Sequence, residues 1–254
     1  MRILNYSLLC PTRGRPDGLQ RLIESVAATA GAVERVEVLA YVDSDDPALP
    51  DYKRMFEALA KVGVELRRFT ALVGPPKSVS LSWNDLAASS TGDVLMMAND
   101  DQVYVQSGWD SRLDQEIAKF PDDIYCMWFE DGINGEKHCA FPIISRRWYE
   151  TLGYFTPGVF EFIANDTWIM DVAKRVERLH FISDVTVEHR HFSVGKSELD
   201  ETYLRHRSGE NRERIARDML VLDRTGPVRQ RDADRLAAII RSSSNSPVET
   251  GDAR

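Results

Sequence analysis

The sequence has no excess of positive charge, no long apolar run and no paired cysteine motif. Its 32 Lys and Arg against 40 Asp and Glu give a formal net charge of -8, which disfavours generic attraction to nucleic acid or anionic membranes. No stretch approaches the roughly 20 apolar residues that a membrane span needs, and the N-terminal apolar run is too short for a signal peptide. The three cysteines, Cys10, Cys126 and Cys139, lack CxxC spacing, and their odd number suits a reducing compartment. We therefore expect a cytoplasmic protein.

The first hundred residues alternate between strand-like and helix-like patterns. Short apolar runs rich in strand formers are separated by stripes with apolar residues at i, i+3, i+4 and i+7. Strands are expected at 3–10, 36–42, 64–69 and 93–98, with helices over 16–31, 52–63 and 79–90. This order predicts a mostly parallel sheet with helices on both faces. Ligands of such sheets bind beyond the carboxyl ends of the strands.

The second half of the chain is less regular. Strands are expected at 124–129, 139–144 and 181–187, and a helix from Asn165 to about residue 179. From about residue 209 the chain is charged and helical, and 242–254 has the composition of a disordered tail. Five arginines in 204–218 could form a local basic face. The acidic residues between them favour a salt-bridged helix in solvent.

Turn-forming and polar residues gather where the expected strands end. They are Pro11, Thr12, Arg13, Asp43, Asn99, Asp100, Asp101, His189 and His191. Carboxylate oxygens and an imidazole, with positions left for phosphate oxygens and water, suit Mn²⁺ or Mg²⁺. Each short segment alone is more typical of a turn or a surface loop. Their joint placement at one edge of a sheet therefore carries the inference of a divalent cation site.

The order of these segments resembles that of family 2 glycosyltransferases of the GT-A fold. The landmarks, across roughly residues 5–192, are PTRGRP, YVDSDDP, KSVSLSWN, GDVLMMANDD, LGYFTPGVFEFIANDTW and VEHRH. Compact single-domain members from bacteria and their phages are the most similar. The resemblance implies a GT-A domain over 1–208, with a Rossmann-like, nucleotide-sugar-binding part at 1–102 and an acceptor-binding, catalytic part at 103–208. A helical appendage at 209–241 would follow.

The resemblance implies a pocket for a nucleotide-sugar donor, typically a UDP-sugar. The residues it assigns to the donor are Pro11, Thr12, Arg13, Asp43, Lys77, Asn84, Asn99 and Asp100. Asp43 would accept a hydrogen bond from the nucleobase, whereas Lys77 and Asn84 would contact ribose or diphosphate. Asn99 stands where the family usually has Asp and brings no charge, so the cation would depend on Asp101.

The metal site implied by the resemblance consists of Asp101 and one histidine. Mn²⁺ or Mg²⁺ bound there would neutralise the charge of the departing nucleoside diphosphate. His189 and His191 compete for this position, and since alternate strand residues point to opposite faces, only one should face the site. We favour His191, which is nearer the following loop.

The resemblance also implies a catalytic base at Asp166. The pair Asn165-Asp166 follows GYFTPG, where the family has an acidic residue that deprotonates the acceptor hydroxyl. Asn and Asp are also ordinary at helix starts, so the role depends on the other landmarks. One carboxylate without a second nucleophile indicates direct displacement and inversion at the anomeric carbon. The expected activity is that of a metal-dependent, hexosyltransferase-like enzyme.

Two other functions remain open at this point. A nucleotidyltransferase on a similar sheet would usually carry a GxGTRxxP loop, and CPTRGRP has too few glycines. A non-catalytic nucleotide-sugar-binding module would be consistent with Asn99. The acceptor also stays open between a glycan, a lipid carrier, a protein and a modified DNA base.

Other side chains have weaker claims on the site. Lys196 could reach a phosphate, although a solvated lysine is the commoner case. Four tryptophans could stack on an acceptor sugar, and most are expected in the core instead: Trp109, Trp128, Trp148 and Trp168.

Overall fold

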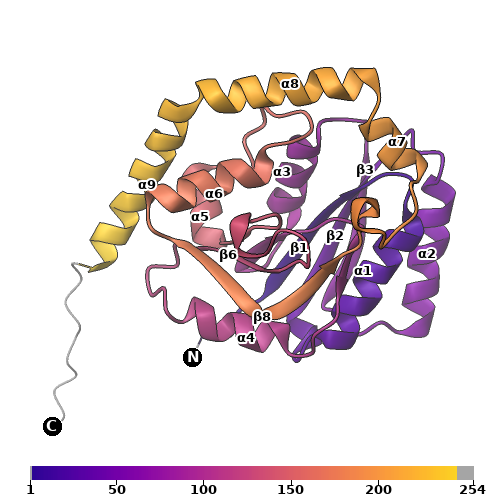
Figure 1. Ribbon diagram of the computed structural model, residues 1–254. Helices are drawn as coiled ribbons and strands as arrows, with labels where there is room; N and C mark the ends of the chain where they lie inside the picture. The colour runs from indigo at the N-terminus through magenta and orange to yellow at the C-terminus, as the bar shows by residue number, and fades with distance from the viewer. Residues whose placement is uncertain (1, 245–254) are drawn as a thin grey trace, which may run out of the picture.

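One curled eight-stranded sheet forms the centre of the computed structural model, which describes residues 2–244 (Figure 1). The strands are β1 (Tyr6–Thr12), β2 (Val36–Asp43), β3 (Arg68–Gly74), β4 (Val94–Met97), β5 (Gln102–Tyr104), β6 (Cys126–Glu130), β7 (Ile143–Ser145) and β8 (Leu179–His189). They lie in the order β3-β2-β1-β4-β7-β6-β8-β5. The first four are parallel to one another and β6 is parallel to β8, whereas β7 and β5 pair antiparallel to their neighbours.

The N-terminal half has the predicted alternation of strand and helix. Helices α1 (Pro16–Thr29), α2 (Leu49–Val62) and α3 (Val79–Ser89) connect its four parallel strands. Pro16 occupies the first turn of α1, where its missing N–H costs nothing. Gly63, with φ 74°, ends α2 in the left-handed conformation that glycine adopts most easily. These local signals explain why the start of α1 and the end of α2 were predictable, whereas α2 begins at Leu49, three residues before the expected position.

The third strand was predicted too early. The sequence indicated 64–69, but β3 begins at Arg68 and continues to Gly74. Arg68 pairs with Glu37 in the register of β2 and β3, and its Nε lies 3.0 Å from the buried Glu37 carboxylate. This ion pair joins a buried carboxylate to a partly exposed guanidinium where the pairing of β2 and β3 begins, and the apolar pattern does not encode it.

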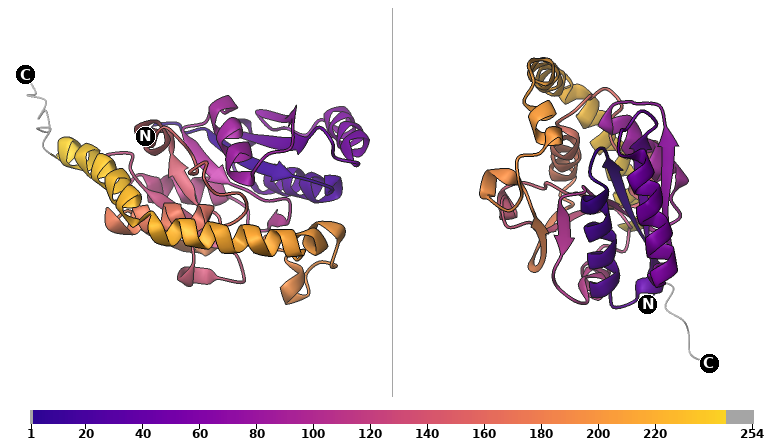
Figure 2. Two further views of the ribbon diagram at one scale, coloured as in Figure 1. Left: turned by 90° about the horizontal axis from the view of Figure 1, so that it is seen from above. Right: turned by 90° about the vertical axis from the view of Figure 1, so that its right-hand side faces the viewer.

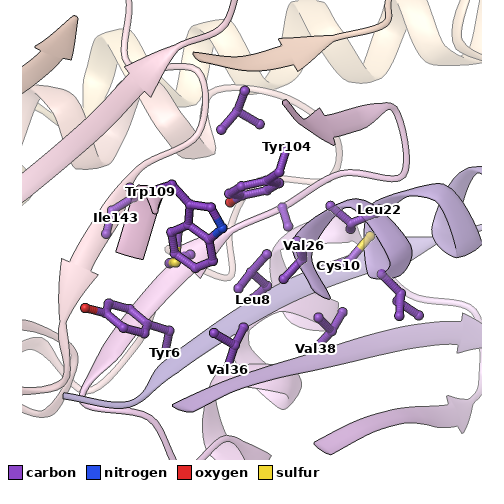
Figure 3. Close-up of a cluster of buried hydrophobic side chains, with 14 of the residues drawn as sticks. Tyr6, Leu8, Cys10, Leu22, Val26, Val36, Val38, Tyr104, Trp109 and Ile143 are labelled. Atoms are coloured by element: carbon purple, nitrogen blue, oxygen red, sulfur yellow. The ribbon is translucent and has the colours of Figure 1, made fainter. Parts of the chain in front are cut away.

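Helices cover both faces of the sheet, as expected. On one face, the core residues of α1 and α2 pack with α4 (Trp109–Ile117). Trp109 is fully buried there, with ring centroids 5.6 Å from Tyr6 and 5.0 Å from Tyr104 (Figure 3). The other face packs against α3, α5 (Arg146–Leu152), α6 (Asn165–Arg175) and α9 (Gly226–Ser244). A fully buried large apolar side chain stabilises the fold by about 1.5–3 kcal/mol.

The second half departs from the sequence expectation in its short elements. β5, α4, α5 and α7 (Glu201–His206) were not predicted, and β7 covers only the end of the strand expected at 139–144. Helix α6 ends at Arg175, four residues early, and β8 begins two residues before the expected 181. Elements of three to nine residues contain too few turns or alternations to produce a distinct period.

Two long helices, α8 (Gly209–Arg224) and α9, follow α7 at the C-terminal side. Figures 1 and 2 show α8 along one side of the molecule, between α7 and α9. Ala233 and Leu236 of α9 are buried in the core shared with α5 and α6. Residues 242–244, expected in the tail, end α9, and 245–254 lie outside the described residues. Within residues 2–244, no helix combines the length and apolarity needed to cross a bilayer.

Candidate active site

The loops that follow β1 and β2 are joined by charged contacts at the carboxyl edge of the sheet. Arg13 Nη1 lies 2.8 Å from Asp43 Oδ2, so two residues assigned to the donor are in contact. The same guanidinium pairs with Asp45. The N–H of Gly14 donates to Asp46 Oδ2 at 2.7 Å, and the Asp46 carboxylate is only 4% exposed. This second contact ties the two loops together.

Asp100 connects the end of β4 to the end of β1. Thr12 Oγ1 donates to Asp100 Oδ2 at 2.7 Å, and Arg15 Nη1 donates to Oδ1 at 3.2 Å. Burial raises the pKa of Asp100 to about 6, although the Arg15 charge opposes this rise. A Cβ on Gly18 of α1 would lie 2.5 Å from the Asp100 carbonyl oxygen. The helix therefore packs directly on the backbone of the acidic loop.

Asp101 has one engaged and one unengaged oxygen. Tyr203 donates its hydroxyl to Asp101 Oδ2 at 3.0 Å, and His189 Nε2 lies 3.4 Å from the same atom. Asp101 Oδ1 is buried and has no hydrogen-bond partner among the described residues. Burial alone would raise the pKa of Asp101, but His189 and Tyr203 hold it below its usual range. A buried, ionised carboxylate with an open oxygen is suited to a cation.

His189 reaches Asp101 because β5 pairs with β8. In this pairing Gln102, next to Asp101, is the partner of His189. The other ring nitrogen, Nδ1, lies 3.6 Å from Asp131 Oδ2, just beyond hydrogen-bond length. Burial lowers the pKa of His189, yet the two carboxylates outweigh it and raise the pKa to about 9. The imidazole thus lies between two carboxylates.

The preference for His191 over His189 is not supported by this geometry. β8 ends at His189, and His191 lies beyond the strand. Its Nδ1 is 2.7 Å from Ser193 Oγ, and its ring packs on Tyr203 with centroids 4.9 Å apart. The histidine beside Asp101 is His189, since only that residue is held by the pairing with β5.

Asp131 is a site residue that the sequence analysis missed. It follows β6 and is 3% exposed, and its carboxylate accepts hydrogen bonds from the N–H groups of Ile133 (2.9 Å) and Asn134 (2.6 Å). These contacts and His189 hold the pKa of Asp131 well below its usual range, against the effect of burial. Its position after a strand, in EDGING, was the signal that could have found it.

The residues around Asp101 fit a divalent cation only in part. No group of three or more His, Cys, Asp or Glu in residues 2–244 is arranged to hold a metal. Asp101 and His189 offer two ligands, and Asp131 stands behind His189 as carboxylates commonly do behind metal-binding histidines. Since Mn²⁺ and Mg²⁺ accept phosphate oxygens and water, a bound diphosphate would supply the remaining ligands.

Two residues assigned to the donor lie in other contacts. Lys77 pairs with Asp85 and its Nζ lies 4.4 Å from the centroid of the Tyr41 ring. Asn84 Nδ2 donates to the Thr156 carbonyl at 2.8 Å, while its Oδ1 accepts from the Phe155 N–H at 2.8 Å. The Asn84 amide thus fixes the backbone at 155–156, and the structure does not bring it to the Asp101 group.

The remaining donor candidates stay at the strand ends. Pro11 is half-buried within β1, opposite Tyr41 of β2. Asn99 is half-buried two residues after the end of β4, and its N–H donates to Gln102 Oε1 at 2.9 Å. Both lie at the edge that carries Asp43 and Asp101.

Asp166 lies in the first turn of α6 and contacts a histidine. Its Oδ2 is 2.7 Å from His138 Nε2, and its side chain is 26% exposed. The hydrogen bond with Asp166 raises the pKa of His138, and the charge of Asp131 adds to this effect. His138 was not predicted, because a lone histidine in an irregular loop has no periodic signal.

The four tryptophans and Lys196 belong neither to the group around Asp101 nor to the Asp166–His138 pair. Trp109, Trp128, Trp148 and Trp168 are between 0% and 4% exposed and belong to the core, as expected for most of them. Lys196 Nζ pairs with Glu188 at 2.9 Å.

A cavity of about 300 Å³ lies at the opposite edge of the sheet. It is lined by charged residues such as Arg2, Asp93 and Asp123. Arg2 pairs with both of these carboxylates. The cavity is therefore a salt-bridged hollow away from the strand ends that carry Asp101.

Comparison with known proteins finds similar solved structures but no match by sequence. No protein-family profile matches the chain, and no curated protein matches its sequence. The mannosyltransferase PcManGT from Pyrobaculum calidifontis, solved in complex with GDP-Man and Mn²⁺, is similar over 98% of this chain and 77% of its own, with a TM-score of 0.66 and 11% identity. TarS of S. aureus is similar over 72% of this chain, with a TM-score of 0.58 and 13% identity.

The chain spans 36% of the length of that TarS structure and 60% of TarS 1-349 in complex with UDP. At such low identities the likeness concerns the fold. These neighbours are glycosyltransferases of the GT-A type, and the sheet order and flanking helices agree with them. The predicted fold class, an α/β fold of the GT-A type, is therefore confirmed.

Proposed function

We propose that this chain is a metal-dependent, inverting glycosyltransferase that moves a sugar from a nucleotide-sugar to an acceptor hydroxyl. The observation that carries the proposal is the loop at 131–138. Its first residue, Asp131, lies against His189 beside Asp101, and its last residue, His138, contacts Asp166. The segment 131–138 thus runs from the His189 ring beside Asp101, the carboxylate suited to a cation, to Asp166, a partly exposed carboxylate proposed to accept a proton.

The donor half of the site is assigned to the strand ends within 1–102. Asp43 and Arg13, which contact each other, would bind the nucleoside, and Asp101 with His189 would hold Mn²⁺ or Mg²⁺. Such a cation, when bound, neutralises charge on the leaving diphosphate. The mannosyltransferase complex contains GDP-Man and Mn²⁺, and TarS 1-349 was solved with UDP-GlcNAc. These complexes support a nucleoside diphosphate sugar as donor, with UDP-sugars as our first choice.

The acceptor half is assigned to 103–208 and uses Asp166 as the base. The acceptor oxygen forms a bond to the anomeric carbon, while the bond from that carbon to the diphosphate oxygen breaks and its electron pair leaves with the diphosphate. Asp166 takes the hydroxyl proton, and His138 orients the carboxylate through the 2.7 Å contact. A positioned base contributes about 10²–10⁴-fold to the rate. The cation and donor positioning must provide the rest.

A donor panel with and without Mn²⁺ tests the proposal. Purified protein is incubated with UDP-sugars and GDP-sugars, and release of the free nucleoside diphosphate is measured. We expect release from one donor, faster with Mn²⁺, and calorimetric binding of the corresponding nucleotide. Absence of both release and binding heat across the panel would refute the function. Pyrophosphate release from a nucleoside triphosphate would instead favour a nucleotidyltransferase.

A further inference from the structure

Helix α8 carries a carboxylate that is completely buried. Asp218 is 0% exposed and accepts hydrogen bonds from three consecutive backbone N–H groups. The Glu161 N–H lies 3.1 Å from both carboxylate oxygens, and the N–H groups of Phe162 and Ile163 lie 2.7 and 3.0 Å from Oδ2. Hydrogen bonds to a charged acceptor are roughly twice as strong as neutral ones. A side chain on α8 thus determines the backbone of a loop far away in the sequence.

This loop leads directly into the first turn of α6. Ala164, at its end, has φ 70°, a conformation that costs free energy for a residue other than glycine. On the opposite side, α3 holds the loop through Ser80 Oγ, which lies 2.7 Å from the Phe160 carbonyl and 2.6 Å from Asn165 Oδ1. The segment before Asp166 is therefore fixed between two helices, and only α8 uses a charge to do so.

We propose that Asp218 is a positioning residue for Asp166. By fixing 161–163, it sets the start of α6 and, with it, the contact between Asp166 and His138. The inference rests on the proposed function of Asp166 as the base, and it makes α8 a part of the catalytic unit. Two further contacts from α8 reach the same loop: Arg217 Nη1 lies 2.8 Å from Glu161 Oε1 and Arg214 Nε lies 3.5 Å from Glu161 Oε2.

The first test is Asp218→Asn, which keeps the shape of the side chain but removes its charge and, with the amide oxygen in the Oδ2 position, turns the NH₂ toward the Glu161 N–H. We expect kcat for transfer to fall roughly 10–100-fold, because displacing a reacting group by about 1 Å can cost 10²-fold. Donor KM and calorimetric donor binding should be unchanged. The pKa of His138, measured by NMR titration, should fall toward its ordinary value of 6.5, since the hydrogen bond with Asp166 raises it.

Two control variants separate positioning from general effects. Asp223→Asn makes the same charge change at an exposed position of α8 and should leave kcat and the His138 pKa unchanged. Leu59→Ala removes a buried side chain of α2 on the other face of the sheet. It should lower the melting temperature without changing the His138 pKa. If Asp218→Asn does not fold, Asp218→Glu is the second variant. It keeps the charge and displaces the carboxylate by one methylene, so kcat and the pKa of His138 should both fall by less.

The possible outcomes are distinct. An unchanged kcat and an unchanged His138 pKa in folded Asp218→Asn or Asp218→Glu would overturn the positioning role. If the wild-type protein transfers no sugar from any donor, the proposed function fails, yet the NMR titration still decides whether Asp218 sets the Asp166 contact. A His138 pKa that is lower in the Asp218 variants but not in the two control variants would support the positioning role.

Discussion

His138 Nε2 lies 2.7 Å from Asp166 Oδ2, which joins a loop before β7 to the first turn of α6. The pKa of His138 is raised mainly by this hydrogen bond, against the lowering effect of burial. Below its raised pKa, His138 is an imidazolium that contacts the Asp166 side chain. An imidazolium next to the carboxylate oxygen makes that oxygen a weaker proton acceptor.

The pH dependence should therefore have opposite signs for stability and for transfer. The pair's contribution to stability is complete below the ordinary histidine pKa of 6.5 and is lost as the pH rises through the raised folded value. Transfer should rise over that same interval, because the Asp166 carboxylate accepts a proton more readily once the His138 ring that orients it has lost its charge. We expect His138→Gln to remove both effects. Melting temperatures and kcat measured from pH 5 to 9 check this, and an unchanged profile in the variant would contradict it.

Replacing Asp101 should abolish metal-dependent nucleotide binding. Removing an outer partner of a metal ligand costs roughly 10–100-fold in affinity, so Asp131→Asn should fall in this range and Asp101→Asn should cost more. Asp51→Asn, at an exposed position of α2, is the matched control. Calorimetry with UDP and Mn²⁺ gives the order of affinities. Equal affinities for Asp101→Asn and the control would remove Asp101 from the site.

Asp166→Asn should separate donor binding from transfer. The amide keeps the size of the carboxylate but cannot accept the hydroxyl proton, so kcat should fall by about 10²–10⁴-fold. Binding of nucleotide with Mn²⁺ should stay unchanged. Asp171→Asn in the same helix, where the carboxylate pairs with Arg175 and Arg229, serves as the control. Transfer at the wild-type rate by Asp166→Asn would exclude its role as the base.

Gly18→Ala should destabilise the acidic loop although alanine favours helices by about 1 kcal/mol over glycine. The new Cβ would lie 2.5 Å from the Asp100 carbonyl oxygen, so helix or loop must shift. We expect a net loss of about 1–3 kcal/mol in the free energy of unfolding, as for other overpacked sites. Urea unfolding measures it. Gly209→Ala, whose added Cβ has only the end of the Arg212 side chain nearby, should show no loss.

The regular half of the fold was predictable because its signals are local. Pro16, Gly63 and the apolar stripes of α1 and α2 determine these elements within a few residues of sequence. The strand-end rule then identified Asp43 and Asp101 as neighbours of one edge. These inferences need only the chain order and the parallel arrangement of the strands.

The other half of the site depends on contacts between distant segments. His138 and Asp131 lie in an irregular loop, and their roles arise from Asp166 and His189, which no local pattern connects to them. The choice between His189 and His191 depended on the three-residue strand β5, which is too short to be recognised from alternation. Asp218, buried in a helix rich in charged residues, likewise has its partners far away at 161–163.

The pairing of β5 with β8 also has a consequence for the order of folding. Gln102 and His189 meet only after the intervening segment has closed as a loop, and contacts between such distant positions form slowly. The parallel β1–β4 sheet can assemble earlier, with Asp101 at its end but without the imidazole. During synthesis on the ribosome, a nascent chain that has not yet emerged beyond β8 would therefore present Asp101 at this edge without the imidazole of His189 beside it.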